Sequence, residues 1–183
     1  MLASVERSIR AQFGVEPARA SITFLGVEPI EVLRFDLGDE AVYVSLGMCR
    51  QPMTGSDATV LALDGPRAEL SIRTRGGERD LWRRLAILAA APMVEGVVYR
   101  DGMTVDLGEP LVLGSRCTGV LVGASTLGPV TVAGGEVQIL QLVPVTATEL
   151  AWCRIHGAPA LRDRWAAQEV DLLDLLRSAA SLG

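Results

Sequence analysis

Apolar residues near the start of the chain recur at a helical spacing. Val5, Ile9 and Phe13 are four residues apart, and charged residues lie between them. This pattern predicts a short amphipathic helix over residues 3–13 that ends at Gly14. One side of the helix must therefore cover an apolar surface elsewhere in the protein.

The following segments show the alternation that is typical of β-strands. Three runs rich in apolar and β-branched residues predict a three-stranded meander. The runs are residues 21–25, 30–37 and 41–46. In the third run Ala41, Tyr43 and Ser45 alternate with larger aliphatic side chains. We therefore expect the aliphatic face of this strand to lie in the core and Tyr43 to lie on a more polar face.

The middle of the chain predicts a hairpin and then a helix. Residues 59–63 and 68–73 are strand-like runs on either side of an Asp-Gly-Pro turn. In the second run Arg73 alternates with aliphatic residues, so it should point away from the core. From Asp80 onward a stripe of leucines indicates a helix, with Asp80 as its N-cap and Pro92 as its end.

The second half of the chain predicts further strands. Residues 97–99 and 103–105 flank an Arg-Asp-Gly turn and read as a short hairpin. Residues 119–122 and 137–143 are apolar runs of strand length. The last of these is apolar almost throughout, which is typical of a central strand that is covered on both faces.

Helical signals then close the chain. Thr146 and Glu149 have the spacing of a capping box, and Gly157 would end the helix that they begin. Pro159 is suited to the first turn of another helix, and residues 170–176 continue as an acidic amphipathic segment. The elements together predict an α+β fold, in which helices pack on a mixed, mostly antiparallel sheet.

Length and charge limit the function. The chain has 183 residues, so we expect a single domain over residues 1–183 with a core of its own. There are 17 basic and 22 acidic residues, and a net charge of −5 argues against a nucleic-acid partner. All the basic residues are arginines, and neither lysine nor asparagine is present. Schiff-base lysines and phosphate-loop lysines are therefore excluded.

Cysteine usage and the N-terminus suggest a compartment. Cys49, Cys117 and Cys153 are odd in number and widely spaced, so we expect free buried thiols, as in a reducing cytoplasm. The N-terminal segment has no apolar run of the length that a signal peptide or a membrane span requires, so we expect no membrane association. The alanine-, glycine- and arginine-rich composition favours a GC-rich bacterial source.

Few residues could support catalysis or bind a metal. His156 is the only histidine, and its place near a helix end is typical of a surface residue that interacts with the helix dipole. Cys153 and His156 have the spacing of half a zinc site, but no second close ligand pair accompanies them. We therefore expect no metal, no cofactor and no enzyme activity. The alternative is a hydrolase or ligand-modifying enzyme built on carboxylates and arginines.

An enzyme of this kind requires a deep cleft in which side chains from distant segments converge. The candidates are Glu69, Arg73, Asp101 and Arg116. A related alternative is an anion site among the clustered arginines, although interleaved acidic residues make an ordinary charged face the simpler interpretation. The clustered arginines are Arg73, Arg75, Arg79, Arg83 and Arg84.

An ordered set of segments resembles the suppressor of fused family over about residues 30–175. The segments are Tyr43–Met48 followed by Pro52–Met53, Ala68–Arg73, the Trp82 helix that closes on Pro92, Asp101–Val105, Leu121–Val122, Ile139–Val145 and Thr148–Trp152. The sequence departs from the family pattern where Met103 replaces a typical histidine. The chain also has the length of one domain, whereas the animal protein has a second domain that completes its peptide cleft.

The resemblance implies a non-catalytic protein-binding domain. In animals the family member sequesters a transcription factor by holding a short extended peptide. Bacterial single-domain members are similar to predicted immunity proteins, which would neutralise a toxin by binding it. The expected partner is therefore another protein, either an extended peptide or a toxin domain.

We expect binding by backbone addition to an edge of the sheet, with Tyr43 and Arg73 as contact residues. The acidic charge would favour a basic partner, and this effect should weaken with added salt. A third hypothesis is a structural assembly module that docks through a helix at residues 172–176.

Overall fold

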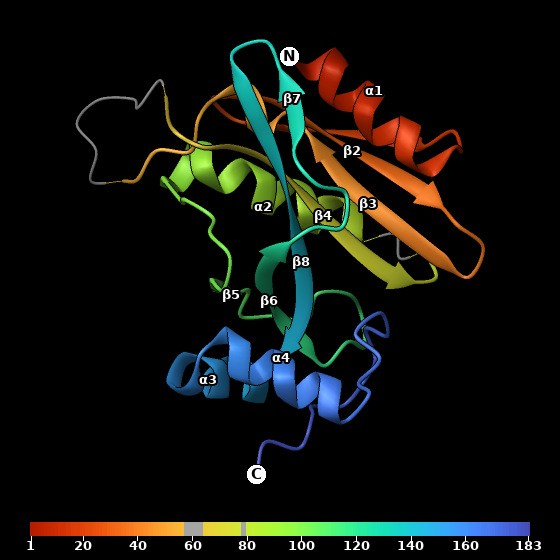
Figure 1. Ribbon diagram of the computed structural model, residues 1–183, viewed down its shortest axis with the longest axis vertical. Coiled ribbons are helices and arrows are strands. Elements are labelled where there is room, and N and C mark those ends of the chain that lie inside the picture. Colours follow the sequence, from red (N-terminus) through yellow and green to blue (C-terminus); the bar gives the residue numbers. More distant parts are fainter. Residues whose placement is uncertain (57–63, 78–79) are drawn as a thin grey trace.

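The computed structural model describes residues 1–56, 64–77 and 80–183 (Figure 1). Its helices are α1 (Leu2–Phe13), the short 3-10 helix η1 (Met48–Arg50), α2 (Leu81–Glu95), α3 (Ala147–His156) and α4 (Ala158–Ala167). Its strands are β1 (Ala18–Phe24), β2 (Val27–Asp36), β3 (Glu40–Leu46), β4 (Arg67–Arg75), β5 (Thr104–Asp106), β6 (Cys117–Ala124), β7 (Val130–Val132) and β8 (Gly135–Thr146).

The strands form one eight-stranded sheet. Seven of them follow the order β1-β2-β3-β4-β8-β6-β5, and β7 pairs with β8 outside this path. The pairing of β4 with β8 is parallel, and the other pairings are antiparallel. The predicted α+β fold with a mixed, mostly antiparallel sheet is confirmed, and so are the meander and the central position of β8.

Helices cover both faces of the sheet. On one face α2 packs against β2, β3 and β4, which pass in front of it in Figure 1. On the other face α1 covers the meander through Val5 and Ile9. The helices α3 and α4 cover the β6–β8 end of that face through Leu150, Leu161 and Trp165. The predicted amphipathic role of the first helix is confirmed.

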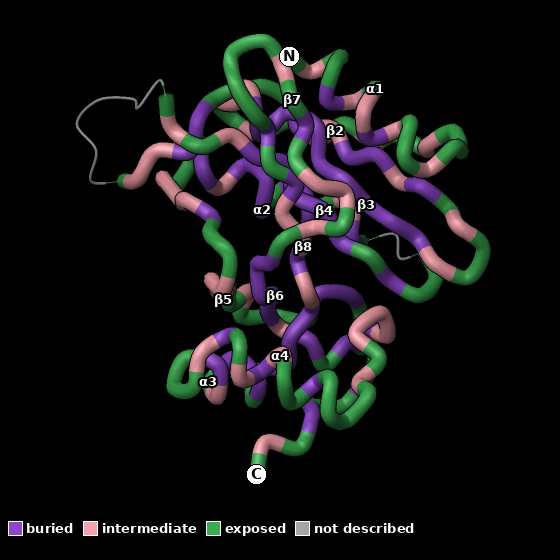
Figure 2. The backbone as a smooth tube through the Cα atoms, viewed as in Figure 1, coloured by how far each residue is buried: buried purple, intermediate pink, exposed green. Residues whose placement is uncertain are grey.

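The expectation that Tyr43 lies on a polar face is wrong. Every residue from Ala41 to Leu46 is buried, because α2 covers one face of β3 and α1 covers the other (Figure 2). Tyr43 has no exposed surface and meets the ring of Trp82 edge-on, with ring centroids 5.8 Å apart. The alternating residues of β3 therefore face two apolar layers, one on each side of the sheet, and neither face is exposed to solvent.

Pro92 does not end its helix, in contrast to the sequence expectation. The helix continues to Glu95 and ends at Gly96, whose φ of 67° is left-handed. A proline inside a helix leaves the carbonyl four residues earlier without its usual donor, here the carbonyl of Leu88. The hydroxyl of Tyr99 donates to this carbonyl oxygen at 2.7 Å and so replaces the missing backbone bond. Asp80 occupies the N-cap position, although its side chain makes no capping hydrogen bond.

Other local expectations have mixed outcomes. The predicted capping box of Thr146 and Glu149 is confirmed, with both reciprocal hydrogen bonds present. Residues 97–99 form no strand, and β7 lies in a segment that was expected to be a connection. The expected strand at residues 59–63 lies outside the described residues. Its predicted partner, β4, pairs with β3 and β8.

The C-terminal segment, residues 170–183, is a strap rather than the expected amphipathic helix. Turns at residues 172–173 and 175–176 interrupt an otherwise irregular backbone, and the strap runs past the ends of β4 and β8 and the start of β6. The amide of Arg75 donates to the carbonyl of Leu173 at 2.8 Å, and the hydroxyl of Ser115 donates to the carbonyl of Leu175. A docking helix at residues 172–176 is therefore wrong for this fold.

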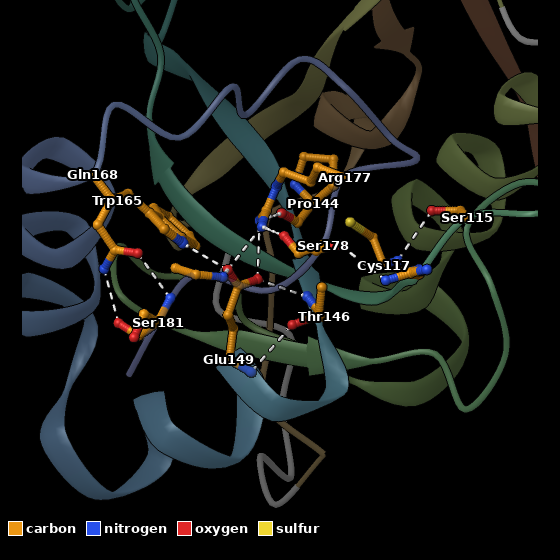
Figure 3. Close-up of polar contacts among 12 residues, drawn as sticks. Ser115, Cys117, Pro144, Thr146, Glu149, Trp165, Gln168, Arg177, Ser178 and Ser181 are labelled. Carbon is orange, nitrogen blue, oxygen red and sulfur yellow. Dashed lines mark hydrogen bonds and ion pairs between the residues drawn. The ribbon is translucent and has the colours of Figure 1, made fainter. Parts of the chain in front are cut away.

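A buried ion pair fixes the strap (Figure 3). The Arg177 guanidinium donates to both carboxylate oxygens of Glu149, at 2.7 and 2.9 Å, and also to the carbonyl of Pro144. Glu149 accepts further bonds from the Trp165 indole and from the amides of Thr146 and Ala180. The strap is thus joined to α3, to α4 and to the end of β8 by one carboxylate.

Candidate functional site

The main path of the sheet ends in two edge strands, β1 and β5. The two edges differ in their surroundings, because β5 borders a hollow that α2 walls on the other side. Figure 1 shows the chain leaving α2 and turning back into β5 at this place. This combination of an open strand edge with an adjoining apolar hollow is the candidate site, which we call the β5 groove.

The hydrogen bonds of β5 show which of its backbone groups face the groove. The amide of Val122 donates to the carbonyl of Met103, and the amide of Leu107 donates to the carbonyl of Thr118. Backbone direction alternates along an antiparallel strand. Thr104 and Asp106 therefore direct their amide and carbonyl groups away from β6. Among the described residues these groups have no backbone partner.

Apolar side chains line the β5 groove. The lining residues enclose about 480 Å³ and come from α2, from the connection after it and from the β5 segment. They are half-buried or exposed for the most part, so they leave apolar surface open to a ligand. The apolar members are Ile87, Leu88, Ala91, Val97, Tyr99, Met103, Val105 and Leu107.

Tyr99 is a buried residue at the base of the groove. Its hydroxyl is committed to the carbonyl of Leu88 inside α2, and its ring is buried. Burial raises the pKa of the phenol, and the nearby charge of Glu95 raises it further. The phenol therefore stays protonated and keeps its donor role. Tyr99 therefore replaces the backbone hydrogen bond that Pro92 removes from α2. The same bond fixes the segment that leads from α2 to β5.

Acidic side chains dominate the rim of the groove. Asp106 pairs with Arg154 at 3.3 Å, and Glu109 pairs with Arg84. The hydrogen bond from Arg84 and its charge lower the pKa of Glu109. Glu95 is exposed and has no ion-pair partner within the described part of the chain. Its negative charge therefore lies at the rim of the groove without a paired cation among these residues.

Neither predicted contact residue lies in this groove. Tyr43 belongs to β3 and pairs with β2 and β4, whereas Arg73 belongs to β4, whose pairing with β8 ends two residues earlier, at Ser71. Tyr43 is buried, whereas Arg73 is exposed on the face opposite α2 and pairs with Glu40 at 2.5 Å. A bound strand cannot add beside Tyr43, because strands occupy both of its sides. The role of both residues in partner contact stays a prediction.

The residues of the enzyme hypothesis do not converge. Glu69 is buried and accepts hydrogen bonds from Ser45 and from the amides of Gly47 and Cys49, so it anchors η1. Asp101 pairs with Arg162. The other two residues also have partners of their own, Glu40 for Arg73 and Ser178 for Arg116. Each member is held by a separate contact rather than aimed into a shared cleft.

The arginine cluster and the zinc motif are likewise dispersed. Arg75 pairs with Asp171 and Arg84 with Glu109, so these two guanidinium groups have separate carboxylate partners. Arg79 lies outside the described residues. His156 is exposed and stacks on Trp152 at 4.2 Å between ring centroids, whereas Cys153 is buried. The described residues contain no group of three or more histidine, cysteine or acidic side chains that could hold a metal.

The β5 groove is not predicted from the sequence. One signal was available, because Met103, Val105 and Leu107 alternate with Thr104 and Asp106 on a strand bounded by turns. A second was the spacing of Ile87 and Ala91, which form an additional apolar row on a helix that already has a leucine stripe. The apolar row of α2 and the apolar face of β5 come together only through tertiary contact, so neither pattern alone predicts a groove.

Comparison with known proteins reveals clear relatives in sequence pattern and fold. The family described as Suppressor of fused protein (SUFU) matches residues 26–178, which agrees with the resemblance over about residues 30–175. No curated protein matches the sequence.

Three solved structures have the same fold as the chain. A protein described as a SUFU homologue from Neisseria gonorrhoeae is 19% identical, with a TM-score of 0.76 over 100% of this chain and 97% of that one. A chain of the Sufu–Fu complex is 16% identical, with a TM-score of 0.74 over 98% and 91%. Drosophila Suppressor of Fused is 15% identical, with a TM-score of 0.68 over 98% of this chain and 50% of that one.

None of the helices within the described residues has the length and apolar character needed to cross a bilayer.

Proposed function

The chain belongs to the suppressor of fused family, and from this premise we propose that it is a non-catalytic domain, spanning residues 1–183, that binds an extended segment of another protein in the β5 groove. One structure of the same fold is that of a Sufu–Fu complex, so a related chain binds a protein partner. For this chain the proposal is supported by the structure of the groove itself.

The outward-facing backbone of β5 is the observation that carries the proposal. Thr104 and Asp106 offer amide and carbonyl groups that an added strand can pair with. Main-chain hydrogen bonds supply affinity in this mode of binding, and adjacent pockets supply specificity. The apolar wall of α2, with Ile87 and Ala91, gives alternate side chains of the added strand a place to be buried.

The lining defines the chemistry of the ligand. Met103 occupies the groove at the position where the resemblance leads us to expect a histidine, so this part of the groove is apolar and adaptable. Glu95 lies at the rim with no ion pair to any residue that the structure describes, and the chain as a whole carries a net charge of −5. An extended segment with apolar residues at alternate positions and a basic residue near Glu95 fits these features.

The test removes one backbone donor without changing the sheet. Thr104→Pro deletes an amide that faces away from β6, and edge strands tolerate proline where the amide points outward. Thr104→Val is the matched control, because it keeps the amide. Peptides selected from a displayed random library on the wild-type protein should bind Thr104→Val normally and Thr104→Pro at least about tenfold more weakly. Equal binding to all three proteins would reject strand addition at β5.

We further propose that the partner is a toxin and that binding neutralises it, as the resemblance to bacterial immunity proteins suggests. The partner captured by the wild-type protein from its host, and not by Thr104→Pro, should arrest growth when it is expressed alone. Co-expression of the wild-type chain should restore growth, and Thr104→Pro should not. A captured partner that leaves growth unaffected would reject the toxin role and would leave peptide binding intact.

A further inference from the structure

The opposite edge of the sheet has a different character. The strand β1 has seven residues, more than twice the length of β5, and it pairs with β2 on one side. Among the described residues, no backbone hydrogen bond reaches its other side. This side of β1 therefore offers a row of backbone groups that an added strand can pair with.

The side chains of β1 do not protect this edge. Long exposed edges are usually guarded by charged residues, prolines or bulges. Arg19 is the one charged residue of the strand, and it is neutralised by Glu6 of α1 and by Glu31 of β2. Residues 20–24 are uncharged, and the irregularity in the pairing with β2 lies at the hairpin end, between Ile22 and Phe24.

We propose that β1 pairs with β1 of a second copy of this chain, antiparallel about a two-fold axis at Ser21, and so joins two sheets into one. An isologous contact of this kind requires a surface that is complementary to itself. The sequence of β1 meets this requirement in size and in charge.

The size pattern is complementary on the α2 side of the sheet. Ala20 and Ile22 lie on this side and are half-buried. In the register centred on Ser21, Ile22 of each copy lies opposite Ala20 of the other, so a large side chain meets a small one twice. Two residues farther on, the same register places Phe24, which is half-buried, opposite the exposed Ala18 of the second copy.

The charge pattern is complementary on the other side. Arg19, Ser21 and Thr23 are the exposed residues of the central stretch. In the same register Arg19 of each copy faces Thr23 of the other, and the two serines meet at the axis. The two arginines are then separated by four residues along the strands, about 14 Å at the rise of a β-strand. This separation exceeds the Debye length of about 8 Å, and each arginine already has its own carboxylates.

Charge placed at the axis tests the register. Ser21→Lys and Ser21→Glu each put two like charges opposite each other, which should weaken dimerisation at least about tenfold. An equimolar mixture of the two variants puts opposite charges at the axis and should restore a dimer, as measured by sedimentation velocity. Ser21→Thr is the control and should remain dimeric.

Three outcomes would overturn the proposal. The wild-type protein could sediment as a monomer at high concentration, the single-charge variants could dimerise as well as the wild type, or the mixture could remain monomeric. Ser21 is exposed and lies in the other edge strand from Thr104, so peptide binding to the β5 groove should be equal in all the Ser21 variants. That assay separates a failure of self-association from a failure of the proposed function.

Discussion

Glu149 shows how much depends on one buried side chain. Burial acts to raise the pKa of this carboxyl, but the hydrogen bonds from Arg177, Ala180, Thr146 and Trp165 outweigh that effect and lower the pKa. The charged form is therefore the one that the fold requires. The same residue begins α3 through the capping box and holds the strap, so its loss affects two elements at once.

Arg177→Ala should be strongly destabilising. The substitution leaves the Glu149 carboxylate buried without its cation, and such a change costs about 3–5 kcal/mol. Urea denaturation measures the loss. Arg116→Ala is the control, because Arg116 is exposed and its partner is the hydroxyl of Ser178. A loss below 1 kcal/mol for Arg177→Ala, near that of the control, would show that the pair does not hold the fold.

Acid should weaken the same contact. Because the pKa of Glu149 in the fold lies below its ordinary value of 4.5, the stabilisation is complete above that value and is lost as the pH falls through the lower, folded-state pKa. The free energy of unfolding should therefore fall more steeply with acidification in the wild type than in Glu149→Gln. Equal slopes for the two proteins between neutral pH and pH 3 would contradict the assignment.

Tyr99 should be important because of Pro92. Tyr99→Phe removes the donor to the Leu88 carbonyl and should cost about 1–3 kcal/mol, the usual penalty for an unsatisfied buried group. In a Pro92→Ala background the restored amide can donate to that carbonyl, so the cost of Tyr99→Phe should be smaller. Thermal denaturation of the four proteins measures the coupling. A cost that is the same in both backgrounds would show that the hydroxyl does not replace the backbone bond.

At the scale of elements, local signals predict the fold well. The helical spacing of Val5, Ile9 and Phe13 and the capping box at Thr146 are fixed by near neighbours in the sequence, and both predictions are confirmed. Alternation in β3 predicts a strand but not what covers each face. That depends on α1 and α2, which are distant in the chain. For the same reason the apolar face of Tyr43 was mistaken for a polar one.

The strap and the β5 groove exceed what local pattern can predict. Residues 170–176 have a helical apolar spacing, but the chain forms turns there, with Leu175 buried in the core and Arg177 paired with Glu149. Tertiary contact overrides local preference in such cases. The groove arises only where β5 and α2 meet, so contact residues chosen by alternation alone fell on internal strands.

For the whole molecule, removal of the strap should destabilise the entire fold and not only the C-terminal segment. A chain truncated after Glu169 lacks Leu175, Ala180 and Arg177, which serve two core clusters and the buried ion pair. We expect this truncated protein to be poorly folded, as judged by amide exchange in β6 and α3. A shorter truncation that removes Leu182 and Gly183 is the control and should stay near wild type. Native-like exchange in the longer truncation would show that the strap is peripheral.

The order of the strands has a consequence for synthesis of the chain on the ribosome. The strand β8 lies between β4 and β6 in the sheet, yet it is the last strand to be translated, and it pairs with β4 across about 70 intervening residues. Until β8 emerges, the meander and β4 can assemble, but the free side of β4 is an unpaired apolar edge. A nascent chain in this state is exposed to aggregation for the time needed to translate those residues, several seconds at about 5–20 residues per second. Slow codons before β8 would lengthen that interval, so translation rate in this one region should affect the yield of soluble protein.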